Sequence, residues 1–115
     1  MPTIFHKIIR RELPADIVHE DEHLIAFRDI APQAPVHVLF VPKVDVATLD
    51  DLQADQAEVV GRLALAAAAY ARKEGLAEDG YRIVMNFNED GGQTVFQSHL
   101  HLRAGAPRGR FGTPA

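Results

Sequence analysis

Short and continuous runs of apolar residues mark three strands in the first part of the chain. Residues 17–20 and 23–27 form two short runs around an acidic turn, and this pattern predicts a β-hairpin. Residues 36–41 form a longer apolar run that is broken only by His37, which predicts a central strand. The segment 31–35 contains two prolines, so we expect an ordered loop there instead of a helix.

Two segments carry apolar residues at helical spacing. Residues 3–10 place them at i, i+4 intervals, which predicts a short N-terminal helix with one buried face. The alanine-rich segment 51–74 predicts one long helix that starts at Asp50, with Gln53 following in a capping box. Gly75 is the expected C-terminal stop of this helix.

The last third of the chain predicts two further strands, at residues 81–86 and 95–103, from their alternating bulky apolar side chains. Side chains of a strand alternate between its two faces, so Gln97, His99 and His101 should project together on one side. The apolar residues between the histidines should project on the other side. The second of these strands therefore predicts a row of two imidazoles and one amide.

A glycine turn precedes this polar row. Residues 90–94 read Asp-Gly-Gly-Gln-Thr, and Gly91 and Gly92 suit positive φ angles and close backbone approach. Concave arrays of backbone N–H groups bind anions, so a nitrogen nucleophile beside this turn suggests chemistry on a phosphate. Taken separately, the histidines would only be the solvent face of a strand, and the turn only a hairpin connection.

Length and composition predict one ordinary globular domain over residues 1–115, with a loosely structured tail from about residue 104. The net charge of −4 argues against non-specific nucleic-acid binding, which needs a basic face. The absence of cysteine excludes disulfides and thiolate zinc sites and fits a reducing cytoplasm. There is no apolar leader and no run long enough to span a membrane, so we expect a cytoplasmic protein without membrane attachment.

The segment Gly-Gly-Gln-Thr-Val-Phe-Gln-Ser-His-Leu-His-Leu at residues 91–102 resembles the signature of the histidine triad (HIT) family. Within that family the chain is most similar to the Hint-like branch of nucleotide-binding hydrolases. Residues 26–35, Ala-Phe-Arg-Asp-Ile-Ala-Pro-Gln-Ala-Pro, resemble the second landmark of the family. One departure is that the first triad position holds Gln97 where the family has histidine.

The resemblance implies an α+β fold of the HIT type, with a curved, mainly antiparallel sheet of about five strands, one long helix and one short N-terminal helix. It also implies that His99 attacks the α-phosphate of a nucleotide and forms a nucleotidyl-histidine, while His101 steadies the phosphate oxygens. His37 would support the triad histidines without contacting the substrate. From sequence alone, a lone histidine in an apolar run is more often a hydrogen-bonded core residue. Gln97 could still form hydrogen bonds but could not buffer protons, so we expect activity to be retained at a lower level.

The same resemblance assigns a nucleotide site. Asp29 would hold the ribose, although from sequence alone capping a turn is its commoner role. Asn86 would contact the ribose-phosphate, although turn chemistry also explains it. The residues implied to bind the nucleotide are Ile4, Phe5, Ile8, Phe27, Asp29, Ile30, Asn86, Gly92, Gln93 and Thr94. Arg103, Arg108 and Arg110 could approach a phosphate or remain solvated.

Chemistry on a phosphate sets three requirements for this site. The nucleophilic imidazole must be neutral, and its second ring nitrogen needs an acceptor, for which the backbone carbonyl of Gln97 is a candidate. The phosphate charge needs preorganised donors, which the 91–94 turn can supply. No metal or other cofactor is required. The resemblance, and not these requirements, implies the function of a nucleoside phosphoramidase or similar nucleotidyl hydrolase that acts on purine nucleotidyl substrates and binds an AMP- or GMP-like ligand.

Two other interpretations stay open. The Gln97 substitution keeps a non-catalytic nucleotide-binding or interaction module of the HIT fold in consideration. A metal enzyme that uses His37, His99 and His101 is a weaker alternative, because three histidines can bind zinc. Some bacterial relatives carry structural zinc, but the comparable positions hold Thr3, His6, Asp45 and Gln97, so we expect no metal here. Relatives of this branch join their sheets in a homodimer, and we expect the same of this chain.

Overall fold

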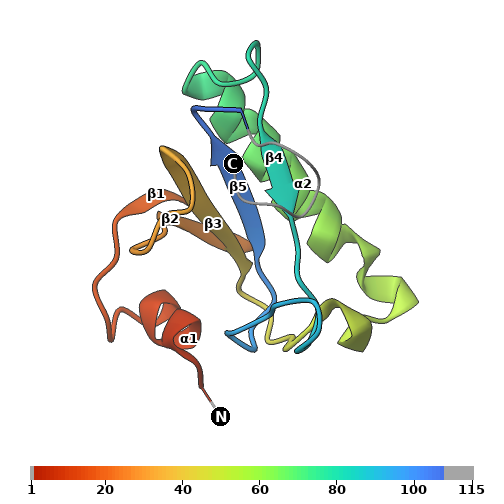
Figure 1. Ribbon diagram of the computed structural model, residues 1–115. Helices are drawn as coiled ribbons and strands as arrows, with labels where there is room; N and C mark the ends of the chain where they lie inside the picture. Colours follow the sequence, from red (N-terminus) through yellow and green to blue (C-terminus); the bar gives the residue numbers. More distant parts are fainter. Residues whose placement is uncertain (1, 108–115) are drawn as a thin grey trace.

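The computed structural model describes residues 2–107 as an α+β fold, which confirms the predicted class. One five-stranded antiparallel sheet has the strand order β1-β2-β3-β5-β4 (Figure 1). Helix α2 covers one face of this sheet, and helix α1 lies on the other face. The elements are α1 (Ile4–Ile9), β1 (Ile17–Glu20), β2 (Leu24–Arg28), β3 (Val36–Pro42), α2 (Ala57–Lys73), β4 (Arg82–Val84) and β5 (Leu100–Ala104).

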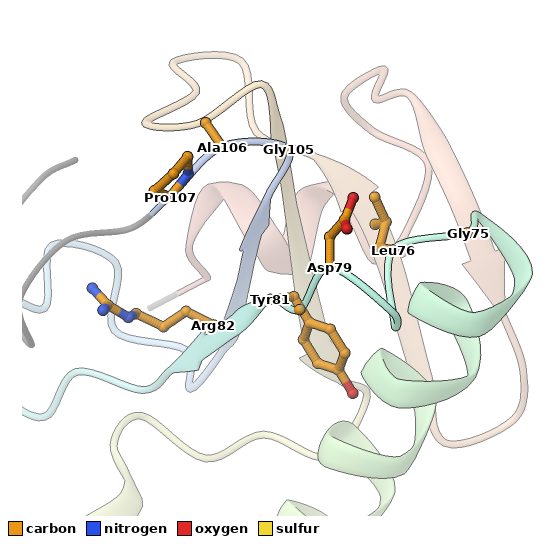
Figure 2. Close-up of a pocket in the computed structure, with 9 residues that line it drawn as sticks. Gly75, Leu76, Asp79, Tyr81, Arg82, Gly105, Ala106 and Pro107 are labelled. Atoms are coloured by element: carbon orange, nitrogen blue, oxygen red, sulfur yellow. The ribbon is translucent and has the colours of Figure 1, made fainter.

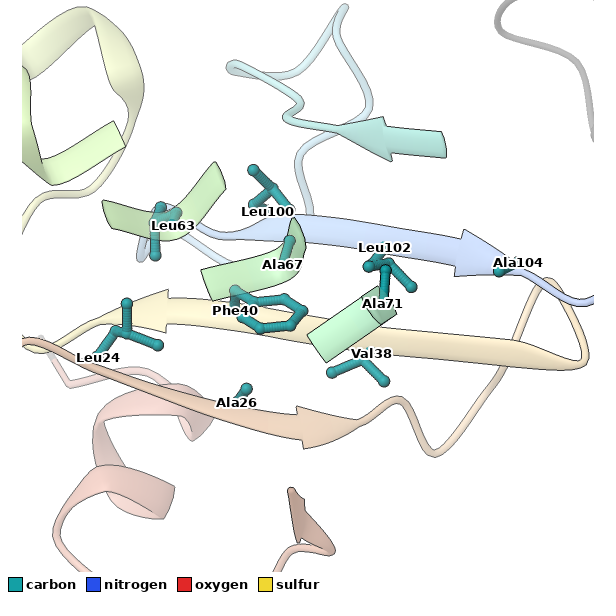
Figure 3. Close-up of a cluster of buried hydrophobic side chains, with 10 residues drawn as sticks. All are labelled: Leu24, Ala26, Val38, Phe40, Leu63, Ala67, Ala71, Leu100, Leu102 and Ala104. Carbon is teal, nitrogen blue, oxygen red and sulfur yellow. The ribbon is translucent and has the colours of Figure 1, made fainter. Parts of the chain in front are cut away.

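The larger core lies between the sheet and helix α2. Alternate residues of β2, β3 and β5 point at the helix and pack against Leu63, Ala67 and Ala71 of α2. Small alanines on the helix let it approach the sheet closely, and Phe40 fills the centre of the interface (Figure 3). Each large apolar side chain buried here contributes about 1.5–3 kcal/mol to folding. The members are Leu24, Ala26, Val38, Phe40, Leu63, Ala67, Ala71, Leu100, Leu102 and Ala104.

The opposite face of the same strands carries a smaller core and the predicted chemistry. Ile25, Phe27, Leu39 and Val41 pack there against Phe5 and Ile8 of helix α1. His37 and His101 occupy the same face, because each alternates with residues that point at α2. One face of the sheet therefore supplies the scaffold, and the other face is available for a site.

The N-terminal half follows the predictions closely. Helix α1, the β1–β2 hairpin and strand β3 begin and end within a residue or two of the expected positions. Thr3 caps α1 through its side chain, which accepts from the backbone N–H groups of Phe5 and His6.

Helix α2 begins later than expected. Two single 3-10 turns, Leu49–Asp51 and Ala54–Gln56, occupy the segment predicted to be its first turns. Asp50 is not the start of the helix, because the chain returns to extended backbone at Leu52 and Gln53. The capping box forms three residues further on, where Gln53 N–H donates to the Gln56 side chain at 3.0 Å. The predicted stop is confirmed, since Gly75 follows the helix with φ 73°.

The C-terminal strands are shorter than expected. Strand β4 covers only residues 82–84 of the predicted 81–86, and β5 starts at Leu100, so residues 95–99 are not strand. The chain leaves β5 at Gly105, which has φ 94°. Arg108 and Arg110 lie outside the described residues. None of the helices in the described part is long and apolar enough to cross a bilayer.

Candidate active site

His99 and His101 lie side by side on the α1 face of the sheet, as the alternating pattern predicted. Their ring centroids are 4.9 Å apart, with His101 inside β5 and His99 directly before it. The two residues are only 7% and 9% exposed. They are therefore held in a largely buried environment at the end of a strand, where packing fixes their orientation.

The orientation of His99 follows from its contacts. Its Nδ1 lies 2.8 Å from the backbone carbonyl oxygen of Gln97, which can only accept, so Nδ1 carries the proton. The lone pair of the neutral ring is then on Nε2. The edge of Phe5 packs against this ring with centroids 4.9 Å apart and planes at 83°. The carbonyl predicted to fix the tautomer is confirmed.

His37 and His101 form a second pair, on neighbouring strands. Because His37 lies opposite Arg103 in the register of β3 and β5, it is the diagonal neighbour of His101. The backbone N–H of Gln33 donates to His37 Nδ1 at 3.0 Å, so the ring proton of neutral His37 is on Nε2. That proton is donated to His101 Nδ1 at 2.9 Å. His101 therefore carries its own proton on Nε2, and a hydrogen-bonded relay runs from the proline-rich loop to the second triad histidine.

Burial keeps both triad imidazoles neutral. It lowers the pKa of His99, against the opposing effects of the Gln97 carbonyl and the Asp29 carboxylate. Burial lowers the pKa of His101 to about 3, and the repulsion that Arg103 and any protonated form of His99 or His37 would exert lowers it in the same direction. At neutral pH, His99 is thus available as a nucleophile and His101 as a neutral hydrogen-bond donor.

Asp29 combines the two roles weighed for it from the sequence. Its Oδ1 accepts from the backbone N–H of Ala31 at 2.8 Å, which is the turn-capping contact. Its Oδ2 lies 3.5 Å from His37 Nε2, at the edge of the histidine cluster. The carboxylate thus faces the site while the turn holds it in place.

The glycine turn follows the prediction in part, because two of its expected backbone donors, Gly92 N–H and Gln93 N–H, already donate to the carbonyls of Glu89 and Asn88 at 2.9 and 3.0 Å. Gly92 has φ 87°, and a Cβ on Gly91 would overlap the backbone of Phe87. Thr94 is exposed at the end of the turn. Gln93 is different, because its buried side chain donates to the carbonyls of Ala47 and Val95 and accepts from Asn88 N–H. Both amide hydrogens of Gln93 are already used, so this side chain holds the turn together.

Gln97 does not join the polar row as expected, because residues 95–99 are not strand. Its side chain is fully buried and points at the backbone of the 42–46 loop that follows β3. The alternating pattern wrongly predicted the direction of the Gln97 side chain. The backbone groups that bind its amide lie more than fifty residues earlier in the chain, so the local pattern does not reveal them. The contribution of Gln97 to the site is therefore its backbone carbonyl, bonded to His99, and a loop contact.

The apolar residues predicted to hold a base fall into two groups. Phe5, Ile8 and Phe27 are buried at 5%, 7% and 3% exposure, with Phe5 edge-on to Phe27 at 5.5 Å. Ile4 and Ile30 are 50% and 96% exposed. Asn86 is half-buried just beyond β4. The exposed isoleucines are thus the side chains free to contact a ligand, and the buried ones form the floor beneath it.

One contact near the site escaped the sequence predictions. His6 Nδ1 accepts from the backbone N–H of Thr3 at 2.8 Å, and His6 Nε2 lies 3.1 Å from Asp45 Oδ1. This bond links helix α1 to the 42–46 loop, across 39 residues of sequence. The Thr-x-x-His spacing is a helix-capping signal that could have pointed to the first half of this contact.

Among the described residues, one group has metal-ligating atoms close together, namely Asp29, His37 and His101. It differs from the trio weighed in the sequence, since Asp29 takes the place of His99. In this group His37 Nε2 and His101 Nδ1 share one hydrogen, so neither atom is open as a ligand while that bond is intact. The arrangement fits a hydrogen-bonded histidine pair that fixes a tautomer better than a metal centre.

Two cavities lie beside predicted site residues, although neither is lined by His99 or His101. A cavity of about 600 Å³ lies along Ile4, Thr94 and Phe96, and one of about 250 Å³ includes Asp29 and His37. A third, of about 580 Å³, lies at the end of α2 near Asp79 and Arg82 and contains none of the predicted site residues (Figure 2). No histidine lines this third cavity, so the first two are the ones relevant to imidazole chemistry.

Comparison with known proteins adds independent information. The model of the HIT domain family matches residues 10–107. The purine nucleoside phosphoramidase of Escherichia coli (strain K12) is 51% identical over 107 residues, which cover 93% of this chain and 90% of that protein. The adenylylsulfatase HINT1 of Arabidopsis thaliana is 46% identical, covering 90% of this chain and 71% of that protein.

Solved structures agree with the fold. A HIT family hydrolase from Legionella pneumophila Philadelphia 1 superimposes with a TM-score of 0.92 and 43% identity, covering 99% of this chain and all of that one. A HIT family hydrolase from Clostridium thermocellum Cth-393 superimposes with a TM-score of 0.91 and 42% identity, covering 96% of each chain.

Proposed function

Since the chain belongs to the HIT domain family, we propose that it is a nucleotide-binding hydrolase that cleaves purine nucleoside phosphoramidates or similar nucleotidyl substrates. A relative named purine nucleoside phosphoramidase shares half of its residues with this chain. The observation that carries the proposal is the His99 ring, whose Nδ1–H is bound to the Gln97 carbonyl and whose Nε2 therefore holds the lone pair.

The ligand is an AMP- or GMP-like nucleotide. We assign the base to the exposed Ile4 and Ile30 above the floor of Phe5, Ile8 and Phe27, and the ribose hydroxyls to Asp29. We assign the phosphate to Thr94 and the Asn86 amide, while Gly92 and Gln93 keep the turn in shape, because Gly92 N–H donates to the Glu89 carbonyl at 2.9 Å and Gln93 donates to the Ala47 carbonyl. A carboxylate that already accepts one backbone N–H keeps a second oxygen for a hydroxyl donor.

In the first step His99 Nε2 attacks the α-phosphorus. A P–N bond forms to the ring, and the P–N bond to the leaving amine breaks. The leaving amine takes its proton from solvent water, because a neutral imidazole is not an acid at neutral pH. His101 Nε2–H donates a hydrogen bond to a phosphate oxygen, because His37 holds the other nitrogen of that ring. The Gln97 carbonyl stabilises the positive charge that develops on His99.

In the second step water attacks the same phosphorus and the bond to His99 breaks. The nucleoside monophosphate leaves, and the proton lost by the water returns to the solvent that protonated the amine. His101 stays neutral throughout, because burial lowers its pKa to about 3, and its Nε2–H binds a phosphate oxygen in both steps. Apart from water, neither step needs a group that this chain does not supply.

The test is mass spectrometry of the protein after rapid mixing with adenosine phosphoramidate. Wild-type protein should carry one adenylyl group on His99 and release AMP. His99→Ala should form no adduct and lose at least about a thousandfold in turnover, because the nucleophile is removed. His19→Ala is the matched control, since His19 pairs with Asp21 on the far hairpin and should leave turnover unchanged.

A non-catalytic binding module is the alternative that the same experiment excludes or supports. Suppose that wild-type protein and His99→Ala bind AMP equally well, and that wild-type protein forms no adduct and releases no product. The proposal of a catalytic function would then be wrong. The hydrolase names of the relatives and the neutral, oriented His99 favour catalysis.

We also propose a homodimer in which the sheets of two chains join. Strand β4 is the last strand in the sheet order, so one of its edges has no neighbour within the described chain. Ile83 in this strand is 44% exposed, and Leu65 on α2 is 71% exposed. An edge strand beside exposed apolar side chains favours pairing with a second copy.

A further inference from the structure

Gln97 occupies the first triad position, yet its side chain is turned away from any substrate. Its Oε1 accepts from Val46 N–H at 3.0 Å, and its Nε2 donates to the carbonyls of Pro42 at 3.0 Å and Val44 at 2.8 Å. The residue is 0% exposed. A primary amide is the side chain that supplies one acceptor and two donors at one point, so the site matches glutamine atom by atom.

The orientation of the amide is fixed by this surrounding. Rotating it by half a turn would place its NH2 against the Val46 N–H and its oxygen against two carbonyl oxygens. Only the observed arrangement satisfies all three buried backbone groups. A histidine at this position has at most one donor and one acceptor when neutral, and therefore cannot satisfy all three.

The 42–46 loop is in turn connected to helix α1. Asp45 accepts from His6 Nε2, and His6 Nδ1 accepts from Thr3 N–H at the start of the helix. Helix α1 carries Phe5, whose edge lies against the His99 ring. The ring is bonded to the Gln97 carbonyl, so the contacts form a closed cycle around the nucleophile.

We propose that Gln97 is a positioning residue for His99: its side chain fixes the 42–46 loop, and that loop, through Asp45 and His6, holds helix α1 and Phe5 against the nucleophile. The proposal rests on the proposed function, because it concerns the nucleophile of that reaction. It assigns Gln97 neither a proton nor a contact with substrate. It also gives His6 and Asp45 a role in the site that their sequence positions did not reveal.

The first experiment uses Gln97→Glu and Gln97→His, compared at a temperature where circular dichroism shows both to be folded. The Glu variant keeps the shape and one acceptor but loses both donors. We expect both variants to form the His99 adduct about 10- to 100-fold more slowly, since small misplacements of a reacting group have effects of this size. If Gln97→His forms the adduct as fast as wild type or faster, the proposal is wrong.

A second readout does not depend on turnover. Nitrogen-15 NMR of the imidazoles should show a single Nδ1–H tautomer for His99 in wild type and a mixture in Gln97→Glu. Unchanged His99 signals in the folded variants would overturn the proposal. Wild-type protein that shows the fixed tautomer but releases no AMP would instead defeat the proposed function and leave the positioning role supported.

A surface variant covers the case in which both Gln97 variants fail to fold. Asp45 is 84% exposed in its side chain, so replacing it leaves the core intact. Asp45→Ala removes the acceptor of His6, and we expect adduct formation to slow about two- to fivefold and the His99 signals to broaden. Asp45→Asn keeps an acceptor oxygen and should restore wild-type behaviour. Equal rates and signals for wild type and Asp45→Ala would contradict the cycle.

Discussion

His37 donates its Nε2–H to His101 Nδ1 at 2.9 Å across strands β3 and β5, and this one bond sets where His101 keeps its proton. Without the donor, either nitrogen of His101 could be protonated, and only one tautomer has its N–H on Nε2, where it can donate to a phosphate oxygen. The pairing therefore links a residue inside an apolar strand to the chemistry at the strand end.

The first prediction concerns this pair. His37→Ala removes the donor, so we expect kcat to fall about 10- to 100-fold, because a misdirected His101 N–H no longer stabilises the phosphate oxygens in the transition state, with a smaller change in KM. His37→Gln retains a side-chain N–H donor and should recover part of the loss. Steady-state kinetics on adenosine phosphoramidate measure both. Equal kcat values for the alanine variant and wild type would show that the pair is not used.

The second prediction concerns pH. Both triad histidines have a pKa below 6.5 in the folded protein, so below pH 6.5 the unfolded chain binds more protons than the folded chain. The free energy of unfolding should therefore be constant above pH 6.5 and fall below it, by up to about 1.4 kcal/mol per pH unit for each histidine. Urea unfolding between pH 7.5 and 5 measures this slope.

The control for this slope is His101→Gln, which has no titrating ring at position 101. Its stability should decrease less steeply between pH 6.5 and 5 than that of wild type. The pKa of Asp21, lowered to about 2 by His19 and two backbone N–H groups, affects stability only at more acidic pH. A variant slope as steep as the wild-type slope would show that His101 is not the source.

The third prediction concerns the glycine turn. Gly91→Ala places a methyl group against the backbone of Phe87. We expect the free energy of unfolding to fall by about 1–3 kcal/mol and the affinity for AMP to decrease. Gly61→Ala is the matched control, because Gly61 is exposed in helix α2 with no atom within 4 Å of the new methyl. That control should stabilise the protein by about 0.5–1 kcal/mol. Thermal unfolding and AMP titration distinguish the two sites.

The fourth prediction concerns metals. The nitrogens of His6, His37 and His101 that could meet a metal are engaged in hydrogen bonds, and Gln97 supplies an amide where a ligand would be needed. Dialysis against a chelator should leave turnover and unfolding temperature unchanged. Elemental analysis of the purified protein should find far less than one metal per chain. A stoichiometric metal whose removal abolishes turnover would refute this.

The fifth prediction concerns assembly. Ile83→Arg puts a charge on the edge strand β4 and should convert the proposed dimer to a monomer in light scattering. Ile30→Arg is a comparable exposed isoleucine beside the nucleotide site and should leave the mass unchanged. A wild-type protein that is monomeric at high concentration would remove the basis for this proposal.

Local sequence pattern was enough for most of the scaffold. Periodicity and glycine or proline positions determine α1, the first hairpin, β3 and the end of α2, because the interactions that set these elements lie close in sequence. Alternation also placed His99 and His101 on one face, and the Gln97 carbonyl under His99 was correctly expected. The HIT resemblance supplied the nature of the reaction, which no periodicity encodes.

The errors around the site share a physical cause. Residues 95–99 alternate like a strand, but Gln97 gains more by satisfying three backbone groups of a distant loop than it would from strand pairing. The His6–Asp45 contact and the amide contacts of Gln93 are also long-range, so pattern could not reveal them. These tertiary hydrogen bonds gather around the site, where local preference is most often overridden.

Consecutive residues of β5 serve opposite sides of the sheet, and this has a consequence for how the protein must fold. A slip of one residue in the pairing of β5 with β3 would put Leu100 and Leu102 where the imidazoles react and press two imidazoles under helix α2. Such a misaligned chain would lose its core and its chemistry together. Every chain that folds stably therefore already has its histidines on the correct face of the sheet. Selection for a stable core also selects for a correctly placed site.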